Sequence, residues 1–64
     1  APGDRVAVIK RMIAATQVSL SRVEVNRAQL GAEGRAVDAL SVAGAGHMLQ
    51  ARLNWLEDVL AFYT

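Results

Sequence analysis

The sequence predicts an all-α fold, a helical hairpin or small helical bundle with coiled-coil-like heptad seams. Apolar residues recur at alternating steps of three and four over residues 6–30, and again over residues 49–63. This spacing keeps them on one face of a helix, whereas a strand requires a period of two. Residues 5–30 contain neither proline nor glycine, while glycines cluster at 31–34 and 44–46, where we expect the chain to turn.

Length and composition indicate that this fold is completed by oligomerisation or by a partner. The chain has 64 residues, no cysteine and one histidine. Domains this small are usually stabilised by disulfides, by a structural metal or by association. The composition excludes disulfides and thiolate-bound zinc, so we expect no metal and no cofactor. Residues 1–64 are interpreted as a single helical module.

The first helix is predicted over residues 4–30. Asp4 follows Pro2-Gly3, where its carboxylate can cap the first amides and suits the positive end of the helix dipole. The heptad seam of this helix consists of Val6, Ile9, Ile13, Thr16, Leu20, Val23, Arg27 and Leu30. A stripe of mostly small residues lies beside the seam and predicts a second contact face: Ala7, Ala14, Val18, Ser21, Val25 and Ala28.

Two glycine clusters divide the remainder of the chain. Gly31 is expected to end the first helix in a left-handed conformation, and a continuous helix through residues 31–34 is the alternative. A short helix is predicted over 35–43, a break at Ala43-Gly44-Ala45-Gly46, and a final helix over 47–63. The outer helices then differ in length, so we expect the middle helix to fill the gap or the first helix to project.

The sequence carries no recognisable catalytic pattern, and we expect the protein not to be an enzyme. His47 has no serine or cysteine partner at a typical spacing, and it is interpreted as an exposed turn residue. Glu57 and Asp58 are adjacent on a helix and point about 100° apart, so they cannot act on one substrate. The glycines at 44 and 46 lack the Lys-Ser/Thr pair of a phosphate-binding loop.

Charge and hydropathy bear on the remaining classes of partner. The net charge is +1, and the basic residues are spread around the predicted helices, which makes a nucleic-acid-binding regulator an alternative of low weight. No run approaches the roughly 20 apolar residues that span a bilayer, and no signal-peptide pattern is present. We therefore expect no membrane partner and a cytoplasmic location.

The seam of the first helix contains one charged residue, Arg27. A charged residue at such a position often fixes register or partner choice at a cost in stability. We predict that Arg27→Leu raises thermal stability and loosens partner specificity; the alternative is that the long side chain reaches water. Glu24 lies three residues earlier and can pair with Arg27.

The predicted function is that of a non-enzymatic protein–protein interaction module, a docking or assembly element that buries an apolar face against another helix or a copy of itself. All three aromatic residues lie in the last helix, where they serve either as core or as interface anchors. The predicted interface residues are Ile9, Ile13, Leu20, Val23, Arg27, Leu30, Leu53, Trp55, Leu56, Val59, Leu60 and Phe62. The sequence does not separate core from interface among them.

Three resemblances point the same way, and no family is identified from them. Residues 26–32, Asn-Arg-Ala-Gln-Leu-Gly-Ala, resemble the carboxy-terminal coiled-coil helix of flagellin-like filament proteins. Residues 8–11 with 22–24 are similar to the docking coiled coil of modular polyketide synthases. The size and hairpin layout resemble type III secretion co-chaperones and needle subunits. These resemblances imply a helical chain that buries an apolar face in a partner, such as a filament or secretion subunit.

The tripeptide Gly46-His47-Met48 has a second interpretation. It resembles a cloning-site remnant that precedes a start methionine. On this interpretation, residues 1 to about 45 and residues 48–64 are two proteins joined into one chain, as is done to trap a weak complex.

Overall fold

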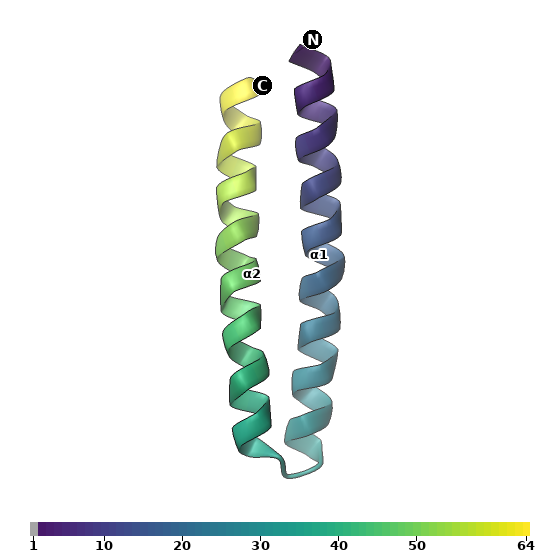
Figure 1. Cartoon of the computed structure of the whole chain (residues 1–64), viewed down its shortest axis with the longest axis vertical. Coiled ribbons are helices and arrows are strands. Elements are labelled where there is room, and N and C mark those ends of the chain that lie inside the picture. The colour runs from purple at the N-terminus through teal and green to yellow at the C-terminus, as the bar shows by residue number, and fades with distance from the viewer. Residues whose placement is uncertain (1) are drawn as a thin grey trace.

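The protein is a hairpin of two antiparallel helices, which Figure 1 shows side by side along their whole length. A computed structural model describes residues 2–64, without the side chain of Pro2. Ala1, the first residue of the predicted module, lies outside the described residues. Helix α1 spans Pro2–Ala32 and helix α2 spans Ala36–Tyr63. Both termini lie at one end, and the turn lies at the other (Figure 1). The predicted all-α hairpin is therefore confirmed.

The heptad seam of α1 faces α2, as its spacing requires. Ile9 and Thr16 are buried, and Val6, Ile13, Leu20, Val23 and Leu30 are half-buried. Thr16 is compatible with this position because its hydroxyl donates a hydrogen bond of 2.8 Å to the Met12 carbonyl oxygen of its own helix. The buried polar atom is thus satisfied without the opposite helix. α1 begins at Pro2 and not at Asp4, so Asp4 lies inside its first turn, where its carboxylate suits the positive end of the helix dipole, and it is not the predicted cap.

The turn is formed by Gly34, which corrects the prediction that Gly31 ends the first helix. Gly34 has φ 76°, the left-handed conformation that only glycine adopts without strain. The Arg35 amide donates to the Leu30 carbonyl oxygen at 2.9 Å, and the Gly34 amide donates to the Gly31 carbonyl oxygen at 3.1 Å. These two bonds form a Schellman motif, which satisfies the last carbonyl groups of α1. Gly31 itself remains helical.

The second break, predicted at residues 43–46, is wrong: α2 runs through both glycines. The separate helices expected over 35–43 and 47–63 are one helix of 28 residues, close to the 31 residues of α1, so neither helix projects far. The physical reason is a seam that the glycines do not interrupt. Its more buried positions step by three and four through Gly46, namely Ala39, Val42, Gly46, Leu49, Leu53, Leu56 and Leu60.

Gly46 packs against α1, and its lack of a side chain permits this contact. A Cβ atom at Gly46 would lie 3.3 Å from Cγ1 of Val23 and 3.7 Å from Oε1 of Glu24. The contact pairs residue 46 with residue 23 across the hairpin. Counted in equal steps from that pair, an antiparallel register sets Leu20 against Leu49 and Ile13 against Leu56. Because the seam is in phase on both sides of residues 46–48, the helix register gives no support to a junction of two unrelated proteins there.

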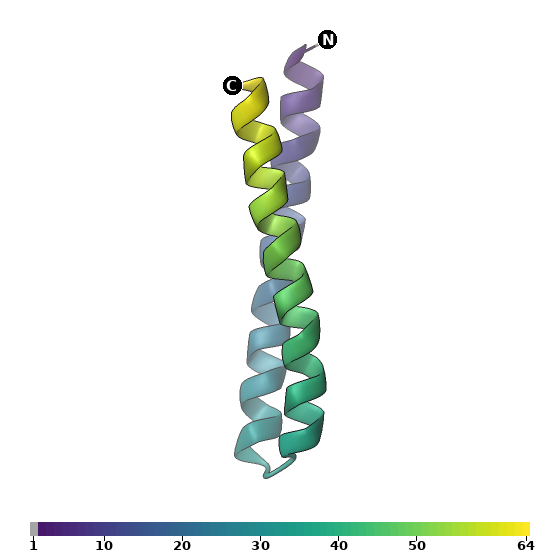
Figure 2. The same cartoon turned by 90° about the vertical axis from the view of Figure 1, so that its left-hand side faces the viewer.

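Packing is densest in the half of the hairpin that carries the termini. Among the described residues, the buried apolar side chains are Ile9, Leu53 and Leu56, and Leu56 is 1% exposed. Towards the turn, α2 offers mainly small residues to α1, such as Ala39 and Ala43. Figure 2, turned by 90°, shows α2 in front of α1 and the two helices crossing near the middle of the rod.

The molecule is a rod with extents of 50 × 14 × 11 Å. Its radius of gyration is 14.8 Å, whereas a compact domain of this length has about 11 Å. Its accessible surface is 4604 Å², against about 4000 Å² for a compact monomer of this mass. Two helices cannot enclose a core, so much apolar surface stays exposed.

Candidate protein-interaction surface

The structure divides the predicted interface residues into two groups. Most of them are buried or half-buried in the contact between α1 and α2: Ile9, Ile13, Leu20, Val23, Leu30, Leu53, Leu56, Val59 and Leu60. Arg27, Trp55 and Phe62 are exposed. The hairpin thus uses the two seams for its own packing, and the available surface of α2 lies elsewhere.

An exposed apolar stripe runs along α2. We call it the outer stripe; its members are Val37, Leu40, Gly44, Met48, Ala51, Trp55 and Phe62, all exposed. The steps between them are three or four residues, with one of seven at the end, so they share one face of the helix. Its large members are unusually open, with Phe62 83%, Met48 76% and Trp55 58% exposed.

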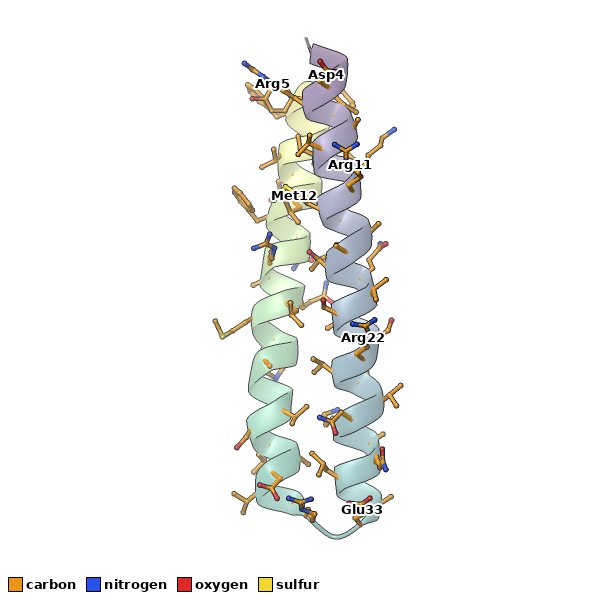
Figure 3. The ribbon with its side chains drawn as sticks, turned by 45° about the vertical axis from the view of Figure 1, so that its right-hand side comes forward. Asp4, Arg5, Arg11, Met12, Arg22 and Glu33 are labelled. Carbon is orange, nitrogen blue, oxygen red and sulfur yellow. The ribbon has the colours of Figure 1, made fainter. Side chains whose placement is uncertain are left out.

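Aromatic and cationic side chains meet at the end of the hairpin that carries the termini. Phe62 and Tyr63 form an edge-to-face pair with ring centroids 5.2 Å apart. The guanidinium carbon of Arg5 lies 6.0 Å from the Tyr63 ring centroid, which joins α1 to α2 by a cation–π contact. Figure 3 shows Arg5 at this end, beside the last turn of α2. An open, mostly apolar groove adjoins the contact and is lined by Asp4, Arg5, Val8, Ile9, Val59 and Tyr63.

A second hollow lies beside Gly46, between α1 and α2. Glu24, Arg27, His47 and Gln50 line it together with Leu20, Ala43 and Gly46. In this hollow the Glu24 carboxylate accepts a hydrogen bond from the Arg27 guanidinium group at 3.0 Å. That ion pair was predicted and is confirmed. The hollow brings His47 near a carboxylate, yet it contains no serine or cysteine nucleophile.

The remaining charges are dispersed along the rod. Arg35 pairs with Asp38 at 2.8 Å across the start of α2. Figure 3 shows Arg11 and Arg22 well separated along α1, and Arg5 at its end beside α2. Within the described residues, no three His, Asp or Glu side chains are grouped so that they could hold a metal ion.

Sequence reasoning did not assign the outer stripe as a unit or give Gly46 a packing role. The signal for the first was present, since Met48, Trp55 and Phe62 recur every seven residues. These three residues were not separated from the core face of the predicted helix over 47–63, and three other stripe members, Val37, Leu40 and Gly44, lay outside that predicted helix. The signal for Gly46 was its place in an otherwise regular three–four series, which outweighs the general tendency of glycine to break helices.

Neither described helix has the length and continuous hydropathy that a bilayer crossing requires. Comparisons with protein-family models, with curated proteins and with solved structures found no match for this chain.

Proposed function

We propose that the protein is a non-enzymatic interaction module whose outer stripe docks onto a helical protein surface. The observation that carries this proposal is the exposure of Met48, Trp55 and Phe62 along one face of α2. Three large apolar side chains in a row expose roughly 400 Å² at about 150–250 Å² per aromatic side chain. The largest patch on a typical monomer covers about 300–600 Å² and is often functional. Aromatic side chains are also the commonest anchors of protein interfaces.

The elongated shape supports the same proposal. A two-helix rod this small gains little stability from its own core, so burial of the outer stripe would add the apolar contact that the hairpin lacks. Assembly into a filament or secretion apparatus would use the same surface. A nucleic-acid-binding role is less favoured, because Arg27 and Arg35 are engaged in ion pairs and the other basic residues do not gather on one face. Salt-dependent retardation of DNA or RNA in a gel would argue for that role instead.

Site-specific photo-crosslinking in the organism that makes the protein tests the proposal. Met48 is replaced by p-benzoylphenylalanine, and Gln17, exposed on α1, is replaced likewise as the control. We expect a discrete crosslinked protein from position 48 and none from position 17. Its identity is then established by mass spectrometry, and the complex is rebuilt from purified components.

Variants of the rebuilt complex decide whether the outer stripe is the interface. Trp55→Gln and Phe62→Gln are expected to weaken the complex at least tenfold, as anchors do. Val25→Gln, a change at an α1 residue that is 68% exposed, is the matched control and should leave the affinity unchanged. No discrete crosslink from position 48, or equal effects of all three variants, would contradict the proposal.

A further inference from the structure

We infer that the partner of the outer stripe is a second copy of this chain, bound antiparallel, α2 against α2. This inference rests on the proposed function and adds the identity of the partner. It is carried by the alternation of large and small residues on one face. Met48, Trp55 and Phe62 form one column, and Gly44 and Ala51 form a neighbouring column with the same spacing of seven.

The two columns are complementary under a twofold axis. In an antiparallel pair, the residue numbers of facing positions have a constant sum. A residue seven positions later in one helix therefore faces a residue seven positions earlier in the other. If Trp55 lies over Ala51 of a second copy, then Phe62, seven residues later, lies over Gly44, seven residues earlier. The symmetry repeats both contacts, so one register gives four contacts of a large residue on a small one. Such interdigitation is how helices pack closely.

Gly44 fits this register, and no contact within the hairpin requires a glycine there. A Cβ atom at Gly44 would meet no atom within 4 Å, in contrast to Gly46, where it would meet Val23 at 3.3 Å. A glycine in a helix interior lowers helix stability relative to alanine. Its presence on the open face of α2 is explained if an aromatic ring of another copy rests there.

The polar neighbours of the stripe fit the same register. Asp58 is the charged residue that falls in the column of Gly44 and Ala51, and it would face Met48 of the second copy. Arg52 of that copy lies one helical turn from its Met48, within reach of the Asp58 carboxylate. Both residues are exposed in the hairpin. The dimer therefore places an opposite charge beside the one acidic group in the contact.

The contact area is sufficient for a reversible dimer. The three large side chains of each copy would remove roughly 800 Å² from water in total, before backbone and flanking side chains are counted. Specific interfaces bury at least about 1000 Å², so the large side chains alone fall short of that value and the flanking groups must supply the rest. A contact of this size implies a weak dimer that dissociates on dilution. A parallel pair would set Gly44 against Gly44 and leave a gap, which disfavours it.

Gly44→Ala tests the inference because hairpin stability and association should move in opposite directions. The variant is expected to raise the melting temperature of the dilute hairpin by about 4–8 °C, since alanine favours helix. It is expected to weaken association at least tenfold in sedimentation equilibrium, since the added methyl group displaces Phe62 of the second copy. Gly31→Ala is the control: it too lies in a helix with open space around its Cβ, and it should raise the melting temperature alone.

A spin label at Ser41 tests the orientation in the wild-type background. In the antiparallel register, the two labelled positions are 24 residues apart along the helix axis, about 36 Å at 1.5 Å per residue. In a parallel dimer they lie side by side. A wild-type chain that stays monomeric at millimolar concentration, or a Gly44→Ala variant that associates as tightly as wild type, overturns the inference. If position 48 then still crosslinks to one other protein, the proposed function stands and only self-association fails.

Discussion

Two glycines, Gly44 and Gly46, lie two positions apart in α2 and meet opposite surroundings. Gly46 faces α1, and a methyl group there would press against Val23, whereas Gly44 faces outward into open space. Because each residue of a helix is rotated by about 100° from the one before, residues two positions apart point to nearly opposite faces. Gly44 and Gly46 therefore meet different neighbours. The stability effect of a substitution at either position therefore depends on which neighbour it meets.

A double-mutant cycle measures the contact at Gly46. Gly46→Ala gains about 1 kcal/mol of helix propensity, and the 3.3 Å contact with Val23 opposes that gain. In a Val23→Ala background the obstruction is gone, so we expect Gly46→Ala to be at least about 0.5 kcal/mol more favourable there. Urea unfolding in a stabilising osmolyte gives the four free energies. Equal effects in the two backgrounds would show that the helices do not approach closely here.

Arg27 occupies a seam position with a charged side chain. It borders both the hollow beside Gly46 and a neighbouring one formed with Gly31, Ala36, Ala39, Leu40 and Ala43. Its ion pair with Glu24 joins side chains that are 45% and 54% exposed, and such pairs contribute at most about 0.5 kcal/mol.

We predict that Arg27→Leu stabilises the hairpin by about 1 kcal/mol, because leucine would cover apolar surface that arginine leaves open. Thermal unfolding followed by circular dichroism measures the change. Glu24→Gln removes the ion pair without altering the seam, and it should change stability by less than about 0.5 kcal/mol. A lower melting temperature for Arg27→Leu would show that the guanidinium group supports the fold.

At the scale of the elements, the turn is set by one backbone conformation. The sequence predicts a turn within residues 31–34. Gly31 was expected to be its left-handed residue, because it directly follows the last seam residue of the first helix, as a glycine at a helix end often does. The structure has the left-handed residue at Gly34 instead. This conformation lets the Arg35 amide donate a hydrogen bond to the Leu30 carbonyl oxygen. Spacing alone does not distinguish two candidate glycines three positions apart.

We expect Gly34→Ala to destabilise the hairpin by about 1–2 kcal/mol, because a side chain disfavours the left-handed conformation. Gly31→Ala should instead stabilise it by up to about 1 kcal/mol. The two variants differ from wild type by the same added methyl group, so unfolding experiments compare them directly. Stabilisation by both would mean that the turn is not built around a left-handed residue at 34.

The seams of both helices could be predicted from the sequence, and the continuity of α2 could not. Leu53 and Leu56 were recognised as apolar seam residues, and both are buried. Gly46 was treated as a breaker because its local preference was considered without its partner Val23. Trp55 and Phe62 could not be separated from the core residues, since helical periodicity identifies a face but not what covers it.

At the scale of the whole molecule, burial is unequal between the two ends of the rod. The buried large side chains lie in the half near the termini, whereas α2 offers mainly small residues to α1 in the half near the turn. Local opening is easiest where few apolar contacts must be broken. The hairpin should therefore loosen from the turn, although its ends are free and the turn is covalently closed.

Native-state hydrogen exchange tests this gradient. We expect the slowest amides in residues 9–20 and 49–60, and exchange at least tenfold faster in residues 27–43. The measurement is made below the concentration at which the chain associates, so that docking does not add protection. Equal protection along the rod would show that the small residues near the turn pack as well as the leucines.

Because both termini lie at one end, the hairpin can be inserted into a surface loop of another protein as a projecting rod. The chain enters and leaves at the same end (Figure 1), so a host polypeptide that carries the hairpin in a surface loop keeps its flanking residues close together. Insertions of this kind are tolerated where the ends nearly meet. The turn at Gly34 is then held up to 50 Å from the host. A host of known structure, extended in this way, would present the outer stripe along a spoke of fixed length.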